Sequence, residues 1–262
     1  MTPERPVPFR GGGFAPRRRR FVALAAFAVL LGAWELAGRG GWISPIFLPR
    51  PGTILGALGD LVRSGALAEH LGASLFRIAA GWTLGSALGF AAGLAIGLFS
   101  LARSAGIPIV SALFPIPKIA LLPLMILWLG IGEASKVATI ALGVFFPTVI
   151  AVYAAVDAVP RNLIRMAQSF GVPPAAILRK VVLPGAWPAI LSGFRITASI
   201  ALILVVSAEM IGAQRGIGQF VLQAGNLMIP EDLLAGIVVL SALGLGIGAL
   251  IGTIERATTR WR

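Results

Sequence analysis

Long apolar runs separated by short polar segments occupy most of this sequence. Each run is close to the roughly 20 residues that an α-helix needs to cross the hydrocarbon core of a bilayer. Six such runs occur, at residues 21–37, 78–99, 106–129, 135–156, 189–211 and 233–254. The pattern predicts an all-α, polytopic membrane protein with six transmembrane helices, in which residues 21–262 form one membrane domain.

Composition agrees with this prediction. The 262 residues are 57% hydrophobic and 12% charged, whereas a soluble domain of this size needs more polar surface. The net charge of +12 would favour nucleic-acid binding in a soluble protein, but here the cations lie at the ends of the apolar runs. Membrane topology therefore explains them better. The chain has no cysteine and only one histidine, His70, so we expect no disulfide and no metal site.

The amino-terminal region has two possible interpretations. Residues 1–20 include four consecutive arginines and predict a flexible basic tail, followed directly by the first apolar run. A basic segment before an apolar one is also typical of a signal peptide. However, residues 38–41 make a poor cleavage site, and Trp34 and Glu35 are unusual in a signal sequence. An uncleaved first membrane helix is favoured.

The distribution of Lys and Arg predicts the orientation. With both termini and the loop 157–188 in the cytoplasm, 15 of these cations lie inside and six lie outside. This bias agrees with the positive-inside rule. Residues 38–76 then lie outside the cell membrane, and the helical spacing of Ile54, Leu58 and Leu61 predicts a short amphipathic helix there.

Two spans have unusual sequences. The second contains glycines at intervals of four, which leave one smooth face for close packing against another helix; they are Gly81, Gly85, Gly89, Gly93 and Gly97. The third contains four prolines, each of which removes a backbone donor, so we expect a kinked or broken helix; they are Pro108, Pro115, Pro117 and Pro123.

The loop 157–188 predicts a helical hairpin. Pro160 and Gly171 are suitably placed at the start and just past the end of a first short helix, and Pro173-Pro174 begin a second that Leu183-Pro184 should end. The predicted hairpin has one apolar and one basic face. Hairpins of this kind also occur as plain interfacial helices between spans, so the pattern alone does not assign a function.

The stretch Arg165–Pro184 resembles the signature loop of ABC importer permeases. That pattern is Glu-Ala-Ala, three residues, Gly, nine residues and Ile-x-Leu-Pro; here it reads Arg165-Met166-Ala167, Gly171, Val181 and Leu183-Pro184. The spacing is kept, while the Glu, the first Ala and the Ile are replaced. Further segments are similar to permeases for nitrate, sulfonate, taurine and related solutes, among them residues 117–124, 128–130, 145–147, 208–211, 216–218 and 255–261.

The resemblance implies a type I ABC importer permease fold with a cytoplasmic coupling hairpin, in a bacterial inner membrane. It implies two permease copies, most simply a homodimer, two ATPase subunits that bind ATP and Mg, and an extracytoplasmic binding protein that delivers a small anion. This chain would bind no cofactor and catalyse no reaction. The resemblance places the ATPase-coupling interface at Arg165, Met166, Ala167, Phe170, Gly171, Pro174, Ile177 and Leu178.

Two charged residues fall within apolar runs. A charge at mid-membrane costs about 2.5–3.5 kcal/mol on insertion scales, so it usually faces a cavity or a partner. Lys118 and Glu209 are therefore candidates for the translocation pathway or its gate. Lys118 has two other interpretations: it pairs with Glu209, or its ammonium reaches an interface.

Two other classes of membrane protein are possible. A secondary transporter would need no ATPase, but such proteins often show inverted repeats, and no convincing repeat is visible. A membrane enzyme needs a nucleophile and base or a metal cluster, and the scattered polar residues offer none. An ABC permease subunit remains the best interpretation.

Overall fold

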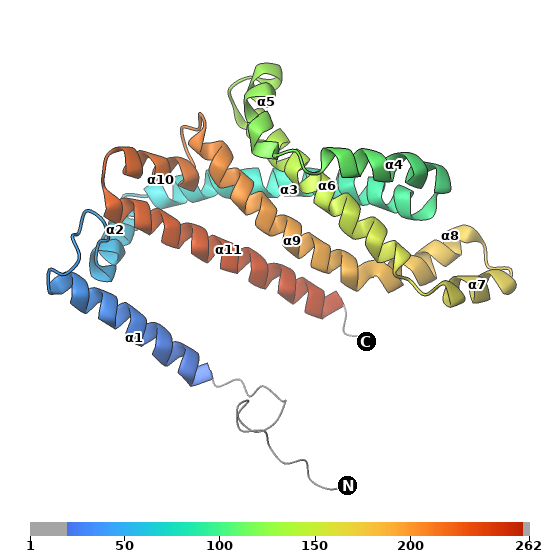
Figure 1. Cartoon of the computed structure of the whole chain (residues 1–262), viewed down its shortest axis with the longest axis horizontal. Helices are drawn as coiled ribbons and strands as arrows, with labels where there is room; N and C mark the ends of the chain where they lie inside the picture. Colours follow the sequence, from blue (N-terminus) through green and yellow to red (C-terminus); the bar gives the residue numbers. More distant parts are fainter. Residues whose placement is uncertain (1–19, 259–262) are drawn as a thin grey trace, which may run out of the picture.

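The computed structural model describes residues 20–258, and within this range every regular element is helical. Of the tail predicted at 1–20, only Arg20 lies among the described residues. Within residues 20–258, five helices are long and apolar enough to cross a membrane; they are α1 (Arg20–Arg39), α3 (Ala66–Leu98), α6 (Glu133–Asp157), α9 (Leu183–Met210) and α11 (Pro230–Thr258), shown in Figure 1.

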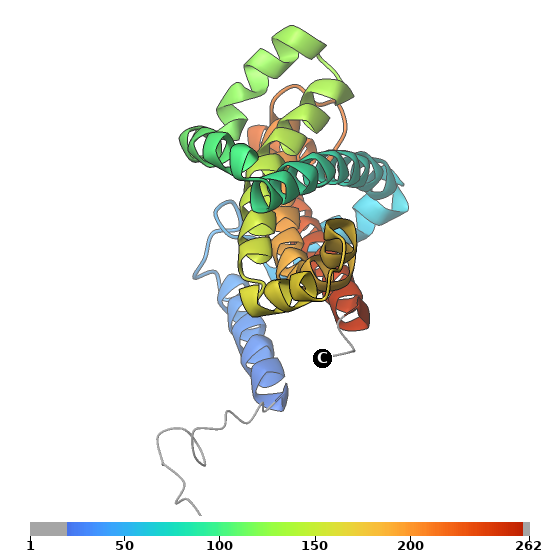
Figure 2. The same ribbon diagram turned by 90° about the vertical axis from the view of Figure 1, so that its right-hand side faces the viewer.

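A bent helix pair is also long and apolar enough, when its two halves are counted together, to form a sixth span. Helices α4 (Ser100–Leu113) and α5 (Leu122–Leu129) are joined by a short 3-10 helix, Lys118–Leu121, and the two halves are bent by 86°. The break predicted from the prolines is confirmed. As a result α5 projects away from the body of the bundle in both views (Figures 1 and 2).

The glycines of α3 pack against α6. A Cβ atom added at Gly89 would lie 2.7 Å from the carbonyl oxygen of Phe145, and one at Gly93 would lie 2.7 Å from that of Val149. Only glycine allows two helix backbones to approach this closely. The prediction that this face packs tightly against another helix is confirmed, and α6 is the partner.

Two parts of the fold differ from the sequence prediction. Helix α3 starts at Ala66, whereas the second span was expected to begin at residue 78, with residues 66–76 outside the membrane. The polar side chains of this first part lowered its hydropathy, but the helix is continuous because those side chains find partners inside the protein. Helix α10 (Ile217–Asn226) was not predicted, while α2 (Pro51–Arg63) matches the expected amphipathic helix.

The hairpin consists of α7 (Arg161–Ser169) and α8 (Pro174–Ile177), and it lies at the end of the bundle opposite α10 (Figure 1). The prediction that Leu183-Pro184 ends the second helix is wrong. A π-helical turn at Leu178–Val182 connects α8 to α9, with the Leu183 N–H bonded to the Leu178 carbonyl. The wider turn precedes Pro184, whose missing N–H falls in the first turn of α9. Residues Pro174–Met210 therefore form one helical run of 37 residues.

Candidate functional site

The hairpin turns at Gly171, which has a left-handed backbone with φ +71°. Its N–H donates to the carbonyl of Gln168 at 2.9 Å, and the N–H of Val172 donates to that of Ala167 at 3.1 Å. These bonds close the carboxyl end of α7, at the position where glycine avoids the steric cost of a Cβ. The predicted turn at Gly171 is confirmed.

The two faces of the hairpin have different environments. Ala167 and Ile177 are buried in a core cluster with Val156, Val182 and Ala186, so they attach the hairpin to its own chain. On the other face Phe170 is 79% exposed and Met166 54% exposed. Of the remaining residues expected at the coupling interface, Arg165, Gly171 and Pro174 are exposed and Leu178 is partly buried. An exposed phenylalanine and methionine side by side on a short helix are available to a partner.

An ion pair supports the base of the hairpin. Arg103 of α4 binds Asp157, the last residue of α6, and its two terminal guanidinium nitrogens donate to the two carboxylate oxygens. A cavity of about 640 Å³ lies beside this pair, between the ends of α3 and α6 and the hairpin. The pair therefore connects the broken span to the segment from which the hairpin begins.

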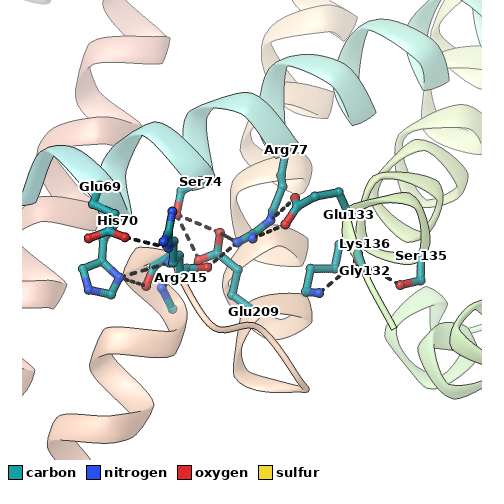
Figure 3. A network of polar contacts seen from close by, with 12 residues as sticks. Glu69, His70, Ser74, Arg77, Gly132, Glu133, Ser135, Lys136, Glu209 and Arg215 are labelled. Atoms are coloured by element: carbon teal, nitrogen blue, oxygen red, sulfur yellow. Dashed lines mark hydrogen bonds and ion pairs between the residues drawn. The ribbon is translucent and has the colours of Figure 1, made fainter. Parts of the chain in front are cut away.

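A network of charged and polar side chains, buried at Arg77 and Glu209 and half-exposed at Glu133, occupies the opposite end of the bundle, and Figure 3 shows its members. At its centre is Arg77 of α3, whose side chain is 3% exposed. It donates two hydrogen bonds of 2.6 Å to the carboxylate of Glu133 on α6, and one of 2.8 Å to Glu209 on α9. A fourth bond, also 2.6 Å, goes to the carbonyl of Arg215. One guanidinium thus connects three membrane helices.

Glu209 anchors the loop between α9 and α10. Its carboxylate is fully buried and accepts hydrogen bonds from Ser74 at 2.8 and 3.0 Å, and from the Gly218 N–H at 2.8 Å. The Ile217 N–H donates in turn to the Ser74 hydroxyl at 2.9 Å. Both carboxylate oxygens accept hydrogen bonds, which is what makes a buried carboxylate tolerable.

The edge of the network reaches the surface. Glu69 pairs with Arg215 at 2.6 Å, and both side chains are substantially exposed. His70 Nδ1 contacts the backbone of Gly216, 3.1 Å from its N–H nitrogen. Lys136 is buried beside Glu133 and donates to the Gly132 carbonyl at 2.9 Å. These contacts complete a polar layer across one end of the protein (Figure 3).

Lys118 makes no hydrogen bond to the members of this layer that the structure describes. Its ammonium donates to backbone carbonyls at the α4–α5 break, while the salt-bridge partner of Glu209 is Arg77. The possible Lys118–Glu209 pair is therefore absent. The side chain is partly buried, near the middle of the bent span.

Comparison with known proteins gives the family. The model of the binding-protein-dependent transport system inner membrane component family matches residues 55–260. The chain belongs to this family. The permease is 36% identical to the taurine transport system permease protein TauC of Escherichia coli K12, over 93% of this chain and 90% of TauC. It is 33% identical to the putative aliphatic sulfonates transport permease protein SsuC of Bacillus subtilis 168, over 94% and 91% of the two chains.

Solved structures agree. The permease is similar to a chain of the MetNI methionine ABC transporter, solved in inward facing conformations, with a TM-score of 0.60 and 25% identity. The match covers 76% of this chain and 96% of that one. The all-α ABC importer permease fold expected from the sequence is confirmed, and the chain is a permease subunit of an ABC importer.

Sequence reasoning missed the main members of the network. Arg77 was counted only as a cation flanking a span, and Ser74, His70 and Glu133 were not considered as a group. Ser74, for example, is 135 residues from Glu209 in the chain, and these side chains meet only in the folded bundle. The one available signal was Glu209 itself, because a carboxylate in an apolar run requires a donor or a cation nearby.

Proposed function

We propose that this permease imports small anions, with taurine and other organosulfonates as the first substrates to test and nitrate as another. The two sequence relatives named above support this choice, because their names specify taurine and aliphatic sulfonates. In this proposal an extracytoplasmic binding protein delivers the anion, and the membrane is the inner membrane of a bacterium with both termini of the chain in the cytoplasm.

The transporter would contain two copies of this chain and two ATPase subunits. ATP and Mg would bind to the ATPases, so this chain needs no cofactor of its own. The observation that carries the coupling proposal is the exposure of two large apolar side chains, Met166 on α7 and Phe170 directly after it. Arg165 adds a positive charge where the family pattern has Glu.

The hairpin interface expected from the sequence then divides into two parts. We propose that Arg165, Met166 and Phe170 contact the ATPase directly, with Pro174 and Leu178 at the margin. Ala167 and Ile177 would act from behind by attaching the hairpin to the bundle, since both are buried. Gly171 would set the angle between the two short helices.

Lys118 and Glu209 would serve the gate through their structural contacts. Glu209 fixes the loop at one end of the bundle, and Lys118 lies at the break of the bent span. Neither side chain needs to touch the transported anion in this proposal.

Uptake into proteoliposomes tests the function. The permease is reconstituted with the ATPase and binding protein of the same organism. Labelled taurine, an alkanesulfonate and nitrate are supplied in separate assays, and ATP is placed either inside or outside the vesicles. We expect ATP-dependent accumulation of at least one anion, and its loss when Phe170 is replaced by Asp. Accumulation by the permease without the ATPase would instead favour a secondary transporter.

A further inference from the structure

The break between α4 and α5 leaves main-chain carbonyls without helical donors. In a continuous helix the carbonyl of Leu113 would accept from residue 117, but that residue is proline and has no N–H. The last regular bond of α4 runs from the Phe114 N–H to Val110. Beyond it the Leu113 carbonyl accepts one long backbone bond, of 3.3 Å, from the Ile116 N–H. Inside a membrane no bulk water is available to replace the missing donors, so each free carbonyl is costly.

Lys118 supplies these donors from its side chain. Its ammonium donates to the carbonyls of Leu113 at 2.8 Å, Phe114 at 3.1 Å and Ile116 at 2.6 Å. A lysine ammonium has three N–H groups, so all three are used. A positive charge also stabilises the carboxyl end of a helix, where the partial charge of the carbonyls is negative.

The same side chain is held against α6. The Lys118 ammonium lies 4.8 Å from the centre of the Phe146 ring, in a cation–π contact. The lysine stem also lies close to Gly143, one turn before Phe146: a Cβ atom added at this glycine would be in ordinary contact, 3.7 Å, with Lys118 Cβ. Lys118 therefore connects the end of α4, the start of the 3-10 turn and α6.

From these contacts we infer that Lys118 is a positioning residue that stabilises the break and fixes the direction of α5. Its ammonium is occupied by the backbone and does not recognise the transported anion. The sequence Pro115-Ile116-Pro117-Lys118 is then a self-contained unit, in which two prolines interrupt the helix and the following lysine satisfies the carbonyls that they leave. This unit maintains the 86° bend through which α5 leaves the bundle (Figure 1).

The bend can be measured directly by pulsed electron spin resonance. The chain has no cysteine, so spin labels attach only at Ile109→Cys on α4 and Leu127→Cys on α5, which are 56% and 78% exposed. The full chain is placed in lipid nanodiscs with an excess of unlabelled chain, so that only distances within one copy contribute. We expect one narrow distance distribution in the parent protein and in Lys118→Arg, which keeps the charge and donors.

Lys118→Met, which has similar length but no donors, should at least double the width of the distribution or shift its centre. Lys118→Gln keeps one amide NH₂ and should give a distance distribution of intermediate width. If the Met variant does not reach the membrane, the Gln variant alone tests the inference. Lys180→Met, which removes an exposed lysine of the π-helical turn Leu178–Val182, is the matched control and should leave the distances unchanged. Parent-like distributions in both Lys118→Met and Lys118→Gln would overturn the inference.

Transport kinetics separate positioning from anion recognition. In the reconstituted importer we expect the maximal uptake rate to fall at least fivefold in Lys118→Met and to recover in Lys118→Arg, with KM unchanged within twofold. A tenfold rise in KM for the anion in both neutral variants, with unchanged spin-label distances, would assign Lys118 to the substrate. The distance measurement needs no substrate, so it stands even if the proposed anions are wrong.

Discussion

Removing the Glu209 carboxylate tests whether the buried network stabilises the bundle. Glu209→Ala deletes the acceptor for Ser74, Arg77 and the Gly218 N–H in a site with no solvent access. Arg77 keeps its two hydrogen bonds to Glu133, so its positive charge is still partly compensated. The loss is therefore that of one partner in a buried ionic network.

The expected cost is large. Breaking a buried ion pair by removing one partner typically costs about 3–5 kcal/mol, because the remaining charge is left without full compensation. Since each 1.4 kcal/mol is about a tenfold change in an equilibrium constant, this is a change of more than about 100-fold. The lost bonds to Ser74 and Gly218 are contained in this figure, since contributions within one network do not add.

The assay is unfolding in mixed micelles by increasing fractions of SDS, followed by fluorescence of the native tryptophans. Glu69→Ala provides a control from the edge of the same network, because the Glu69–Arg215 pair is 47% and 67% exposed and exposed pairs contribute about 0–1 kcal/mol. If Glu209→Ala lowers the unfolding free energy no more than Glu69→Ala does, the network does not stabilise the bundle as described.

Three further predictions follow from the helices. Gly89→Leu should force α3 from α6 and lower yield and melting temperature, whereas Gly72→Leu, on the same helix with open space around it, should not; equal behaviour of the two variants would contradict the packing argument. Gly171→Val should insert normally but lose co-purifying ATPase, with Gly171→Asn milder because Asn tolerates a left-handed backbone at a cost below the roughly 1–2 kcal/mol of other residues. In intact cells an impermeant thiol reagent should label Ser64→Cys and not Ser169→Cys; the reverse result would invert the topology.

Local features of this permease could be predicted from sequence because their causes are local. Pro115 and Pro117, two residues apart, remove two backbone donors from neighbouring turns, and Gly171 ends α7 because of its own backbone freedom. The spacing of Gly89 and its neighbours predicts a smooth helix face. Each of these depends on residues within one or two turns.

The polar network could not be predicted in the same way. Its three main members, Arg77, Glu133 and Glu209, come from three helices, and nothing in the spacing of one helix specifies the partner of another. Hydropathy also misplaced the start of α3, because it scores a buried, paired Arg77 as if it faced water. The π-helical turn before Pro184 was missed for a related reason: a proline was taken to end a helix, while a locally widened turn accommodates it.

The continuous helical run Pro174–Met210 has a mechanical consequence. At 1.5 Å per residue its 37 residues measure up to about 55 Å, with α8 of the hairpin at one end and Glu209 next to the last residue at the other. A rigid rod of this length that tilts by about 10° about its middle moves each end by about 5 Å, in opposite directions. Such a displacement relative to α3 and α10 exceeds the length of the hydrogen bonds that Glu209 makes to them. The run can therefore tilt that far only if α3 and α10 move with it, or if it flexes at the π-helical turn or at Pro188.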